Sequence, residues 1–257
     1  MEEKILFSIT TPCFNSESTI ERTIKSVLAQ EYTNYEYIIV DGGSTDMTID
    51  IIKKYEPLFN GRLRWKSESD KGLYDAFNKG IEQSKGVYCW NVNSDDYIES
   101  DALKILSVII AKYELDKLPI ISGVSRIVTR NGDLVKMEKH SKINADYCYR
   151  TNGMGVTHPA TLVPKSIYDK YGVYDIRFKI SADIDWFNRI YRNNVCILFI
   201  DDILTNMQND GISNQFNYKK NAQDRWLLLK KKYKSRIIRI YFFCRWTVNY
   251  LRTNMFR

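Results

Sequence analysis

Carboxylates are concentrated after three successive apolar segments in the first hundred residues of the chain. Asp41, Asp70 and the adjacent pair Asp95 and Asp96 each follow one such segment. In an open α/β sheet, ligands bind outside the carboxyl ends of the strands, so chemistry is expected at these positions. A single carboxylate at a strand end is ordinary as a turn former or helix cap, but capping does not explain the same bias in three consecutive loops.

The pair Asp95 and Asp96, preceded by Asn93 and Ser94, predicts a site for a hard divalent cation. Two adjacent carboxylates repel each other unless a positive charge lies nearby. A divalent metal bound by one or two carboxylates and by substrate phosphates would relieve that repulsion. Spacing alone leaves a solvated Asp-Asp turn open as the alternative. The chain has no Walker motif and no GxGxxG, so P-loop and dinucleotide redox chemistry lack their phosphate cradles.

The elements that must position these carboxylates alternate between apolar strands and helices with an apolar stripe. A strand at residues 5–11 leads into a helix whose first residues, Ser18 to Glu21, have the form of a capping box. The order of strand, turn and helix then repeats, which predicts an α/β sheet, mostly parallel, with helices on both faces. The further segments expected are strands at 37–40, 63–66 and 87–92 and helices at 48–55, 73–84 and 102–113.

The pattern changes in the second half of the chain. Segments 120–129 and 134–138 flank Asn131-Gly132, which is a signal for an antiparallel hairpin with a two-residue loop. After an irregular stretch, a strand at 160–163, a helix at 182–191 and a strand at 195–200 are expected. The simplest division is one mixed domain, residues 1–218, with halves at about 1–97 and 98–218, followed by a C-terminal extension at 219–257.

Charge separates the extension from the domain. The 257 residues are 44% hydrophobic and 27% charged, which fits a globular protein and excludes disordered and collagen-like classes. Residues 219–257 hold twelve Lys and Arg but one acidic residue, Asp224, for a net charge of +11, whereas the first 218 residues hold 26 basic and 30 acidic side chains, net −4. A nucleic-acid-binding core is therefore disfavoured, and no nucleic acid is expected as a partner.

Compartment and membrane topology follow from the remaining composition. The five cysteines lie 48 or more residues apart without metal or disulfide spacing, which indicates a reducing cytosol. No signal peptide and no run of about 18 apolar residues is visible. The basic extension mixes cationic and apolar side chains, as a segment on an anionic membrane does. Attachment to the inner face of the cell membrane is the first expectation, with a partner-docking or oligomer helix and a solvated tail as alternatives.

The distribution of arginines in the extension weakens the interpretation that it lies on a membrane. On a helical wheel Arg236 and Arg239 share one side, whereas Arg245 and Arg252 lie nearly opposite, so no single apolar face runs through the segment. Two short helices, a bend, or a helix packed partly on the domain would each accommodate that distribution.

Five separated motifs, in order, resemble the family 2 glycosyltransferases with the GT-A fold. They cover roughly residues 5–200, and together they are far more specific than any one alone. The fifth is the acidic motif near the start of a late helix. The motifs are residues 10–15 (TTPCFN), 40–46 (VDGGSTD), 69–80 (SDKGLYDAFNKG), 93–96 (NSDD) and 181–186 (SADIDW).

The resemblance implies a mixed, mainly parallel GT-A sheet whose first half binds a nucleotide-sugar donor, UDP-linked by preference. Phe14 would pack against the base and Asp41 would accept a hydrogen bond from it. Asp95 would hold the ribose, and Asp96 would coordinate Mn²⁺ or Mg²⁺ bridging the diphosphate. The nucleotide-sugar-binding residues implied are Thr11, Pro12, Phe14, Asn15, Asp41, Asp70, Lys71 and Asp95.

The sequence departs from the common family pattern at two positions. Phe77 stands where an Arg usually precedes the Asn of the third motif, so Lys71 and the metal become the candidates to meet the diphosphate charge. Ala182 stands where a Glu usually precedes the Asp of the acidic motif.

The resemblance also implies the base. An acceptor hydroxyl loses a proton as it attacks the anomeric carbon, and a carboxylate opposite the leaving diphosphate can take it. Asp183 occupies the matching position, Asp185 is expected to orient or cap, and His158 is either an ordinary loop residue or an acceptor-site or metal-proximal one. A single displacement from the back face inverts the anomeric centre. The expected activity is transfer of a hexosyl or N-acetylhexosaminyl group.

The acceptor and the loops around it are less determined. A saccharide or a lipid-linked oligosaccharide for a surface polysaccharide such as O-antigen or capsule is the expected acceptor class. The segment from Asp210 to Ser213 resembles a loop that closes over the donor in some relatives, although an ordinary turn explains it equally well. The alternative functions are a sugar-nucleotide pyrophosphorylase, whose Gly-rich Arg-containing loop is missing here, and a catalytically silent nucleotide-sugar-binding subunit.

Overall fold

The computed structural model describes residues 4–151, 153–209 and 218–254, with side chains described as far as residue 251. The loop from Asp210 to Ser213 lies outside the described residues. The N-terminal half alternates strands and helices as the sequence predicts. Its elements are β1 (Phe7–Cys13), α1 (Ile20–Leu28), β2 (Tyr35–Asp41), α2 (Thr48–Tyr55), η1 (Glu56–Phe59), β3 (Leu63–Ser67), α3 (Leu73–Gln83) and β4 (Tyr88–Asn91).

The second half adds antiparallel strands and a group of helices. Its segments β5, α5 and α6 are not predicted from the sequence. The elements are β5 (Tyr97–Ile98), α4 (Ala102–Ile110), β6 (Ile120–Val128), β7 (Leu134–Glu138), α5 (Lys142–Thr151), η2 (His158–Ala160), β8 (Thr161–Pro164), α6 (Lys165–Tyr171), α7 (Ala182–Arg192) and β9 (Ile197–Gln208).

One continuous sheet joins the two halves. Its strand order is β3-β2-β1-β4-β8-β6-β9-β5, and β7 pairs with β6 at the side. β1 to β4 pair in parallel, so their carboxyl ends lie along one edge. β8 runs antiparallel to both β4 and β6, whereas β6 and β9 are parallel. This is the mixed α/β sheet of the GT-A fold, and the carboxyl edge of its parallel half carries the predicted site.

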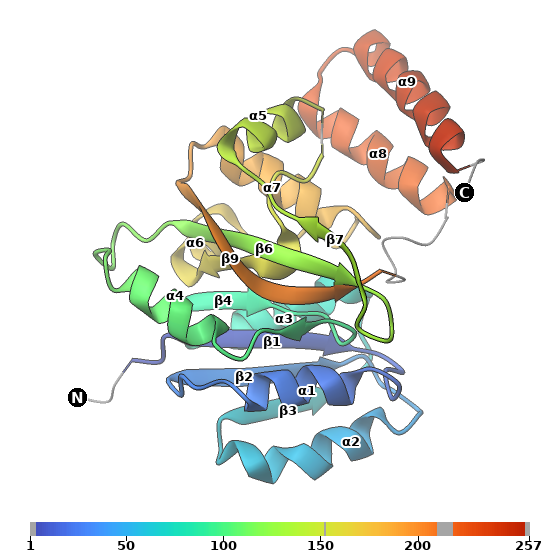
Figure 1. Cartoon of the computed structure of the whole chain (residues 1–257). Helices are drawn as coiled ribbons and strands as arrows, with labels where there is room; N and C mark the ends of the chain where they lie inside the picture. Colours follow the sequence, from blue (N-terminus) through green and yellow to red (C-terminus); the bar gives the residue numbers. More distant parts are fainter. Residues whose placement is uncertain (1–3, 152, 210–217, 255–257) are drawn as a thin grey trace.

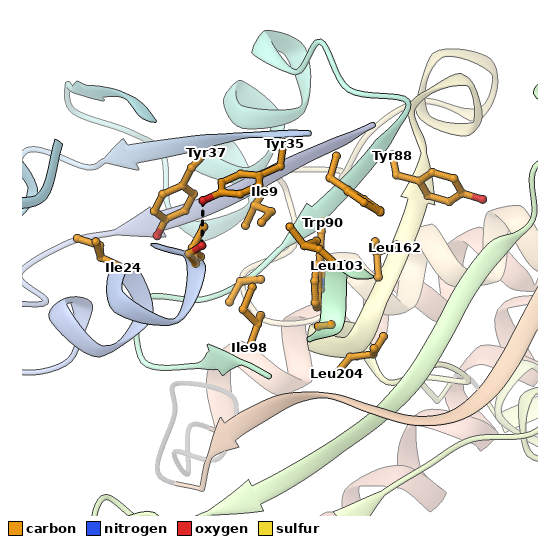
Figure 2. Packing of buried hydrophobic residues seen from close by; sticks show 14 of the residues in the cluster. Ile9, Ile24, Tyr35, Tyr37, Tyr88, Trp90, Ile98, Leu103, Leu162 and Leu204 are labelled. Atoms are coloured by element: carbon orange, nitrogen blue, oxygen red, sulfur yellow. Dashed lines mark hydrogen bonds between the residues drawn. The ribbon is translucent and has the colours of Figure 1, made fainter. Parts of the chain in front are cut away.

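Alternating side chains of the strands divide the core into two layers, one on each face of the sheet. Trp90 and Leu162 point into the layer covered by α1, α2 and α4, where they pack with Ile9 and Leu103 (Figure 2). Their strand neighbours point into the other layer, which α3, α6 and α7 cover. Successive residues of a strand point to opposite faces, so burial on both sides explains the continuous apolar runs that the sequence shows.

Two local details differ from the sequence-based expectation. The β6–β7 hairpin has a three-residue loop, because the closing pair is Thr129 and Asp133 and Gly132 has a positive φ of 90°. An Asn-Gly pair therefore occupies the end of a longer loop here and not a two-residue turn. The capping box is also absent: the N-cap of α1 is Thr19, which makes no side-chain cap, and Glu21 instead accepts a hydrogen bond from Tyr55.

The extension folds into two helices, α8 (Tyr218–Lys232) and α9 (Arg236–Asn254), which run antiparallel beside α5 and α7 (Figure 1). Aromatic side chains join them, with Trp226 of α8 at 5.4 Å from Phe243 of α9. Leu228 and Leu229 of α8 are buried against the domain. Within the described part of the chain, no helix combines the length and the apolar character needed to cross a membrane.

The outward side of α9 carries a line of exposed apolar residues, which we call the outer stripe. Arg239 faces α8, where its guanidinium lies 6.0 Å from the Trp226 ring. At least one of the arginines that seem dispersed on a helical wheel therefore lies on the inner side of α9. The stripe consists of Ile237, Ile240, Tyr241, Val248 and Leu251, of which Ile237 is 80% exposed.

Candidate active site

Hydrogen bonds connect the four loops that follow the parallel strands. The loop after β1 reaches the loop after β2, because the backbone N–H of Asn15 donates to Ser44 Oγ over 2.8 Å. It also reaches the loop after β4, since the Ser16 and Ser94 hydroxyls are 3.0 Å apart. The loops after β2 and β3 are joined by Ser67, which donates to Asp41 over 2.6 Å. The predicted motifs thus form one surface at the carboxyl edge.

Phe14, Gly42 and Asp70 meet on this surface. Phe14 is 61% exposed, so its ring is available for stacking. A Cβ atom built on Gly42 would lie 2.7 Å from Asp70 Oδ2 and 3.4 Å from Phe14 Cδ2. The absence of a side chain at Gly42 therefore lets the aromatic ring and the carboxylate approach each other.

Asp41 lies directly behind this group and is fully buried. Its carboxylate accepts hydrogen bonds from the backbone N–H groups of Gly43 and Ser44 and from the hydroxyls of Ser44 and Ser67. Burial alone would raise the pKa of Asp41, but these hydrogen bonds lower it overall. Asp41 is therefore ionised and fixes the shape of the loop. A hydrogen bond that the base donates to Asp41 stays a prediction.

The other predicted donor-site residues divide into buried and exposed ones. Thr11 and Pro12 are buried in β1, where Thr11 Oγ1 accepts a hydrogen bond from Tyr37 over 3.0 Å. Asn15 has a positive φ of 47°, and its amide oxygen accepts the N–H of Thr45 over 2.9 Å. The Lys71 side chain is exposed beside Asp70 in the loop that leads into α3. Thr11, Pro12 and Asn15 therefore shape the loop, and Lys71 is able to reach an anionic ligand.

The acidic pair sits in the turn between β4 and β5, and its two members differ in exposure. Asp96 is only 1% exposed, whereas Asp95 is half-buried. Asp96 Oδ1 accepts the backbone N–H of Gln208 over 3.1 Å, and Oδ2 accepts the Asn93 side-chain amide over 3.0 Å. Burial, and secondarily the neighbouring Asp95, raise the pKa of Asp96 to about 8. A carboxyl held in this way is poised to lose its proton when a cation arrives.

Arg22 of α1, which sequence reasoning missed, holds this turn in place. Its guanidinium donates to the Asp95 carbonyl over 3.0 Å and to the Gln208 side chain over 2.8 Å, and it covers the Tyr97 ring at 4.6 Å. These partners are 73 or more residues away in sequence. Nothing in the sequence around Arg22 indicates these distant contacts, because a basic residue on a helix is ordinarily exposed to solvent.

The donor set of the turn fits a hard divalent cation. Asn93 Oδ1 is buried without a hydrogen-bond partner, which leaves an oxygen acceptor beside the two carboxylates. Each Asp96 oxygen accepts the one hydrogen bond described above and retains a further lone pair. Among the described residues no group of three or more His, Cys, Asp or Glu side chains could hold a metal by itself. A cation bound here would therefore share its coordination with a ligand, as Mg²⁺ sites completed by phosphates do.

Asp183 lies in the first turn of α7 and is surrounded by aromatic side chains. Its Oδ1 accepts the N–H of Ile184 over 2.8 Å and lies 3.2 Å from the Tyr74 hydroxyl. Burial raises the pKa of Asp183, and the nearby His158 and these hydrogen bonds oppose the rise. The pKa of Tyr74 is raised by burial and by the charge of Asp183, so the hydroxyl keeps its proton. A half-buried carboxylate with a raised pKa is suited to accepting a proton.

The structure accounts for Phe77 at the position of the usual arginine. Phe77 is buried in the second core layer, with its ring 5.7 Å from His158 and 5.9 Å from Tyr174. His158 Nε2 is 3.0 Å from the Tyr174 hydroxyl, and burial lowers the pKa of His158. Phe77 thus faces the aromatic wall around Asp183, and the same wall holds His158 near the candidate base.

Asp185 points away from Asp183, toward basic side chains of α7 and α8. Its carboxylate is buried and lies 2.8 Å from Lys231 Nζ of α8 and 3.6 Å from Arg189 of α7. Ala182, which replaces the usual Glu, is fully buried in the core layer. Of the two carboxylates in the acidic motif, Asp183 therefore lies beside Tyr74, whereas Asp185 holds α8 against α7.

A parallel half whose strand-end loops are joined at one edge, continued by a mixed second half, is the architecture of the GT-A glycosyltransferases. The chain belongs to glycosyl transferase family 2, whose model matches residues 8–196. It is accordingly a glycosyltransferase, and the pyrophosphorylase and silent-subunit alternatives fall away.

Relatives and solved structures of this class resemble the chain over most of its length. A PGL/p-HBAD biosynthesis glycosyltransferase of Mycobacterium bovis is 26% identical over 213 residues, which are 81% of this chain and 79% of that protein. S. aureus TarS 1-349 in complex with UDP-GlcNAc has a TM-score of 0.70 at 20% identity, covering 98% of this chain and 75% of that one. The mannosyltransferase PcManGT of Pyrobaculum calidifontis, in complex with GDP-Man and Mn²⁺, has a TM-score of 0.63 at 13% identity, covering 90% and 65%. The two structural likenesses concern the fold.

Proposed function

We propose that the protein is a metal-dependent inverting glycosyltransferase that moves a sugar from a UDP-linked donor to a hydroxyl group, with Asp183 as the base. The observation that carries the proposal is the combination, in one domain, of two groups. One is the acidic turn, where Asp95 and Asp96 lie beside the buried Asn93 oxygen, and the other is the half-buried Asp183 carboxylate, 3.2 Å from the Tyr74 hydroxyl. The first supplies charge stabilisation for a leaving diphosphate, and the second accepts a proton.

The donor half would bind the nucleotide through its loops. Phe14 stacks on the base, with Asp70 at the base edge beside Gly42 and Lys71 toward the diphosphate. Asp95, the more exposed member of the acidic pair, lies where a ribose and a metal-bound diphosphate would meet the turn. A divalent metal bound by the pair would neutralise the negative charge that develops on the leaving diphosphate. Arg22 keeps the turn in position for this contact.

The acceptor half would supply the base. Asp183 takes the proton from the attacking hydroxyl as the new glycosidic bond forms and the bond to the diphosphate breaks. Tyr74 holds the Asp183 carboxylate by a hydrogen bond, and the Phe77, His158 and Tyr174 side chains exclude water around it. The attack comes from the side opposite the leaving group, so an α-linked donor gives a β-linked product.

The comparisons support the coarse chemistry of this proposal. TarS is bound to UDP-GlcNAc and PcManGT to GDP-Man with Mn²⁺, so proteins of this fold take nucleotide sugars and a divalent metal. UDP is preferred here because TarS is the more similar of these two structures.

The donor panel that tests the proposal compares UDP, GDP, dTDP and their sugars by thermal shift and calorimetry, each with Mn²⁺ and then with excess chelator. We expect one nucleotide, UDP, to raise Tm by several degrees with Mn²⁺, since a ligand at about a hundred times its Kd contributes about 2.7 kcal/mol. Chelator should remove most of that shift. Stabilisation by UDP that chelator leaves intact would contradict the metal requirement, and no stabilisation by any nucleotide would contradict the donor assignment.

The proposed acceptor is a lipid-linked saccharide that the enzyme meets at the inner surface of the cell membrane. The support is the α8–α9 pair, which lies within a segment of net charge +11 and exposes the outer stripe. An exposed apolar stripe in a segment with a large excess of basic side chains matches a surface of anionic headgroups over acyl chains.

The double variant Tyr241→Glu/Val248→Glu is expected to lower binding to phosphatidylglycerol vesicles by roughly tenfold or more, because it places charges on the outer stripe. Flotation with anionic and zwitterionic vesicles measures the effect. Val108→Glu on α4, which is also an exposed valine, is the matched control and should bind normally. Unchanged binding by the double variant would contradict the role of the stripe, and self-association through the stripe in sedimentation would indicate an oligomer interface instead.

A further inference from the structure

The segment that leads into α7 is held from outside the acceptor half by a carboxylate of α8. Asp224 is 1% exposed, although it is the one acidic residue in the basic extension. Its two oxygens accept the backbone N–H of Lys179 at 3.0 Å each, and Oδ2 also accepts those of Ile180 at 2.7 Å and Ser181 at 2.9 Å. Three successive N–H groups thus converge on one buried carboxylate.

This contact holds the chain just before α7, because the N–H groups that it binds belong to residues 179–181 and precede the first turn. Ser181 is the N-cap of the helix but makes no side-chain cap hydrogen bond, so the approach to the first turn depends on Asp224. The Ile180 carbonyl accepts a hydrogen bond from the Tyr74 hydroxyl over 2.5 Å, and the same hydroxyl lies 3.2 Å from Asp183. Asp224 therefore fixes the backbone at Ile180. This backbone leads directly into the turn that carries Asp183, and it binds Tyr74, the hydrogen-bond partner of Asp183.

Lys231 makes a second tie from the same helix. Its ammonium group lies 2.8 Å from Asp175 Oδ2 and 2.8 Å from Asp185 Oδ2. Asp175 precedes the segment bound by Asp224, and Asp185 follows Asp183 in α7. The two α8 side chains thus hold the segment on both sides of the candidate base, across 43 or more residues of sequence.

We infer that Asp224 and Lys231 are positioning residues for the base, so that α8 belongs to the catalytic apparatus although it lies in the basic extension. The inference rests on the proposed role of Asp183. A base works only within hydrogen-bond reach of the proton it removes, and a displacement of about 1 Å can cost roughly a hundredfold in rate. Loss of the Asp224 carboxylate removes acceptors for three backbone donors and allows this segment to shift.

The test is Asp224→Asn in the full-length chain, measured as turnover of UDP-GlcNAc, or of the sugar nucleotide that stabilises the protein most in the donor panel, with Mn²⁺. The substitution keeps the size of the side chain but turns an amide NH₂ toward backbone donors. We expect kcat to fall about 10- to 100-fold, while donor binding by calorimetry stays within about twofold, because the backbone groups that Asp224 binds, at residues 179–181, lie outside the proposed donor-binding loops. Asp201→Asn, an exposed aspartate on β9, is the matched control.

A double-mutant cycle separates positioning from general stability. If Asp224 acts through Asp183, then Asp183→Asn with Asp224→Asn loses no more activity than Asp183→Asn alone. Full addition of the two losses, or a kcat of Asp224→Asn within twofold of wild type, would overturn the inference. Normal turnover by Asp183→Asn alone would instead refute the proposed base. If Asp224→Asn does not fold, Lys231→Met, at a partly exposed position, takes its place in the cycle, and an additive or absent effect there counts equally against the inference.

Discussion

Asp183→Asn is expected to lower kcat by about 10²- to 10⁴-fold with little change in donor binding, because the amide keeps the shape of the side chain and cannot accept the proton. Tyr74 and the Ile184 N–H still have an oxygen to bind, so the local fold is retained. Steady-state turnover together with calorimetry of the donor measures the two effects separately. Asp169→Asn, on the exposed side of α6, is the control.

The pH dependence of activity provides a second test of Asp183 as the base. Burial raises the pKa of Asp183 above its usual value near 3.8, and a base must be ionised to act. Activity should therefore be full above the raised pKa and fall as the pH drops through it, at a higher pH than an ordinary aspartate would give. A variant Asp183→Asn that keeps wild-type turnover, or that keeps the acid limb of the wild type, would remove Asp183 from the mechanism.

The second large effect is expected for Asp96→Asn, which should abolish most of the Mn²⁺-dependent part of donor binding. The amide oxygen can still accept the Gln208 N–H, so the turn keeps its shape, but the negative charge that attracts the cation is lost. Without metal the variant should be at least as stable as wild type. Burial already favours the neutral form of Asp96, and the repulsion from Asp95 disappears.

Thermal shift with UDP, with and without Mn²⁺, separates the loss of metal-dependent donor binding in Asp96→Asn from any change in the stability of the metal-free protein. Asp101→Asn, which lies at the start of α4 and makes no side-chain cap, is the control and should respond to Mn²⁺ as wild type does. Full Mn²⁺-dependent stabilisation in Asp96→Asn would show that the buried member of the pair is not a ligand. In that case the same measurement on Asp95→Asn decides whether its more exposed neighbour carries the metal alone.

The local sequence pattern predicts the strands and helices of the N-terminal half, but it predicts those of the second half less completely. Each strand–turn–helix unit carries its own signal in short-range spacing, so the strands β1 to β4 and the helices α1 to α4 are confirmed to within a few residues of their predicted bounds. The two-residue β5 is defined by its pairing with β9, more than a hundred residues away. α5 buries only Ala145 of its ten residues and has too weak an apolar pattern to be seen.

The site residues likewise divide into those that a local sequence pattern reveals and those that depend on distant contacts. The sequence identified the carboxylates and Phe14 because their types and order are visible locally. It could not show that Asp96 is buried and Asp95 half-exposed, since burial of Asp96 depends on the backbone of Gln208. It also assigned Asp224 to a basic extension by composition, whereas the three backbone N–H groups at residues 179–181 that Asp224 binds are known only in the fold.

The sequence by itself determined the α/β class, the order of the parallel strands' loops and the residue types available for metal and proton chemistry, because these depend on spacing along the chain. The tertiary structure decided which carboxylate is exposed, why Phe77 faces His158, and that α8 binds the segment carrying Asp183. Those outcomes depend on contacts between residues 40 or more positions apart, and desolvation and hydrogen bonding act on such contacts only once the chain has folded.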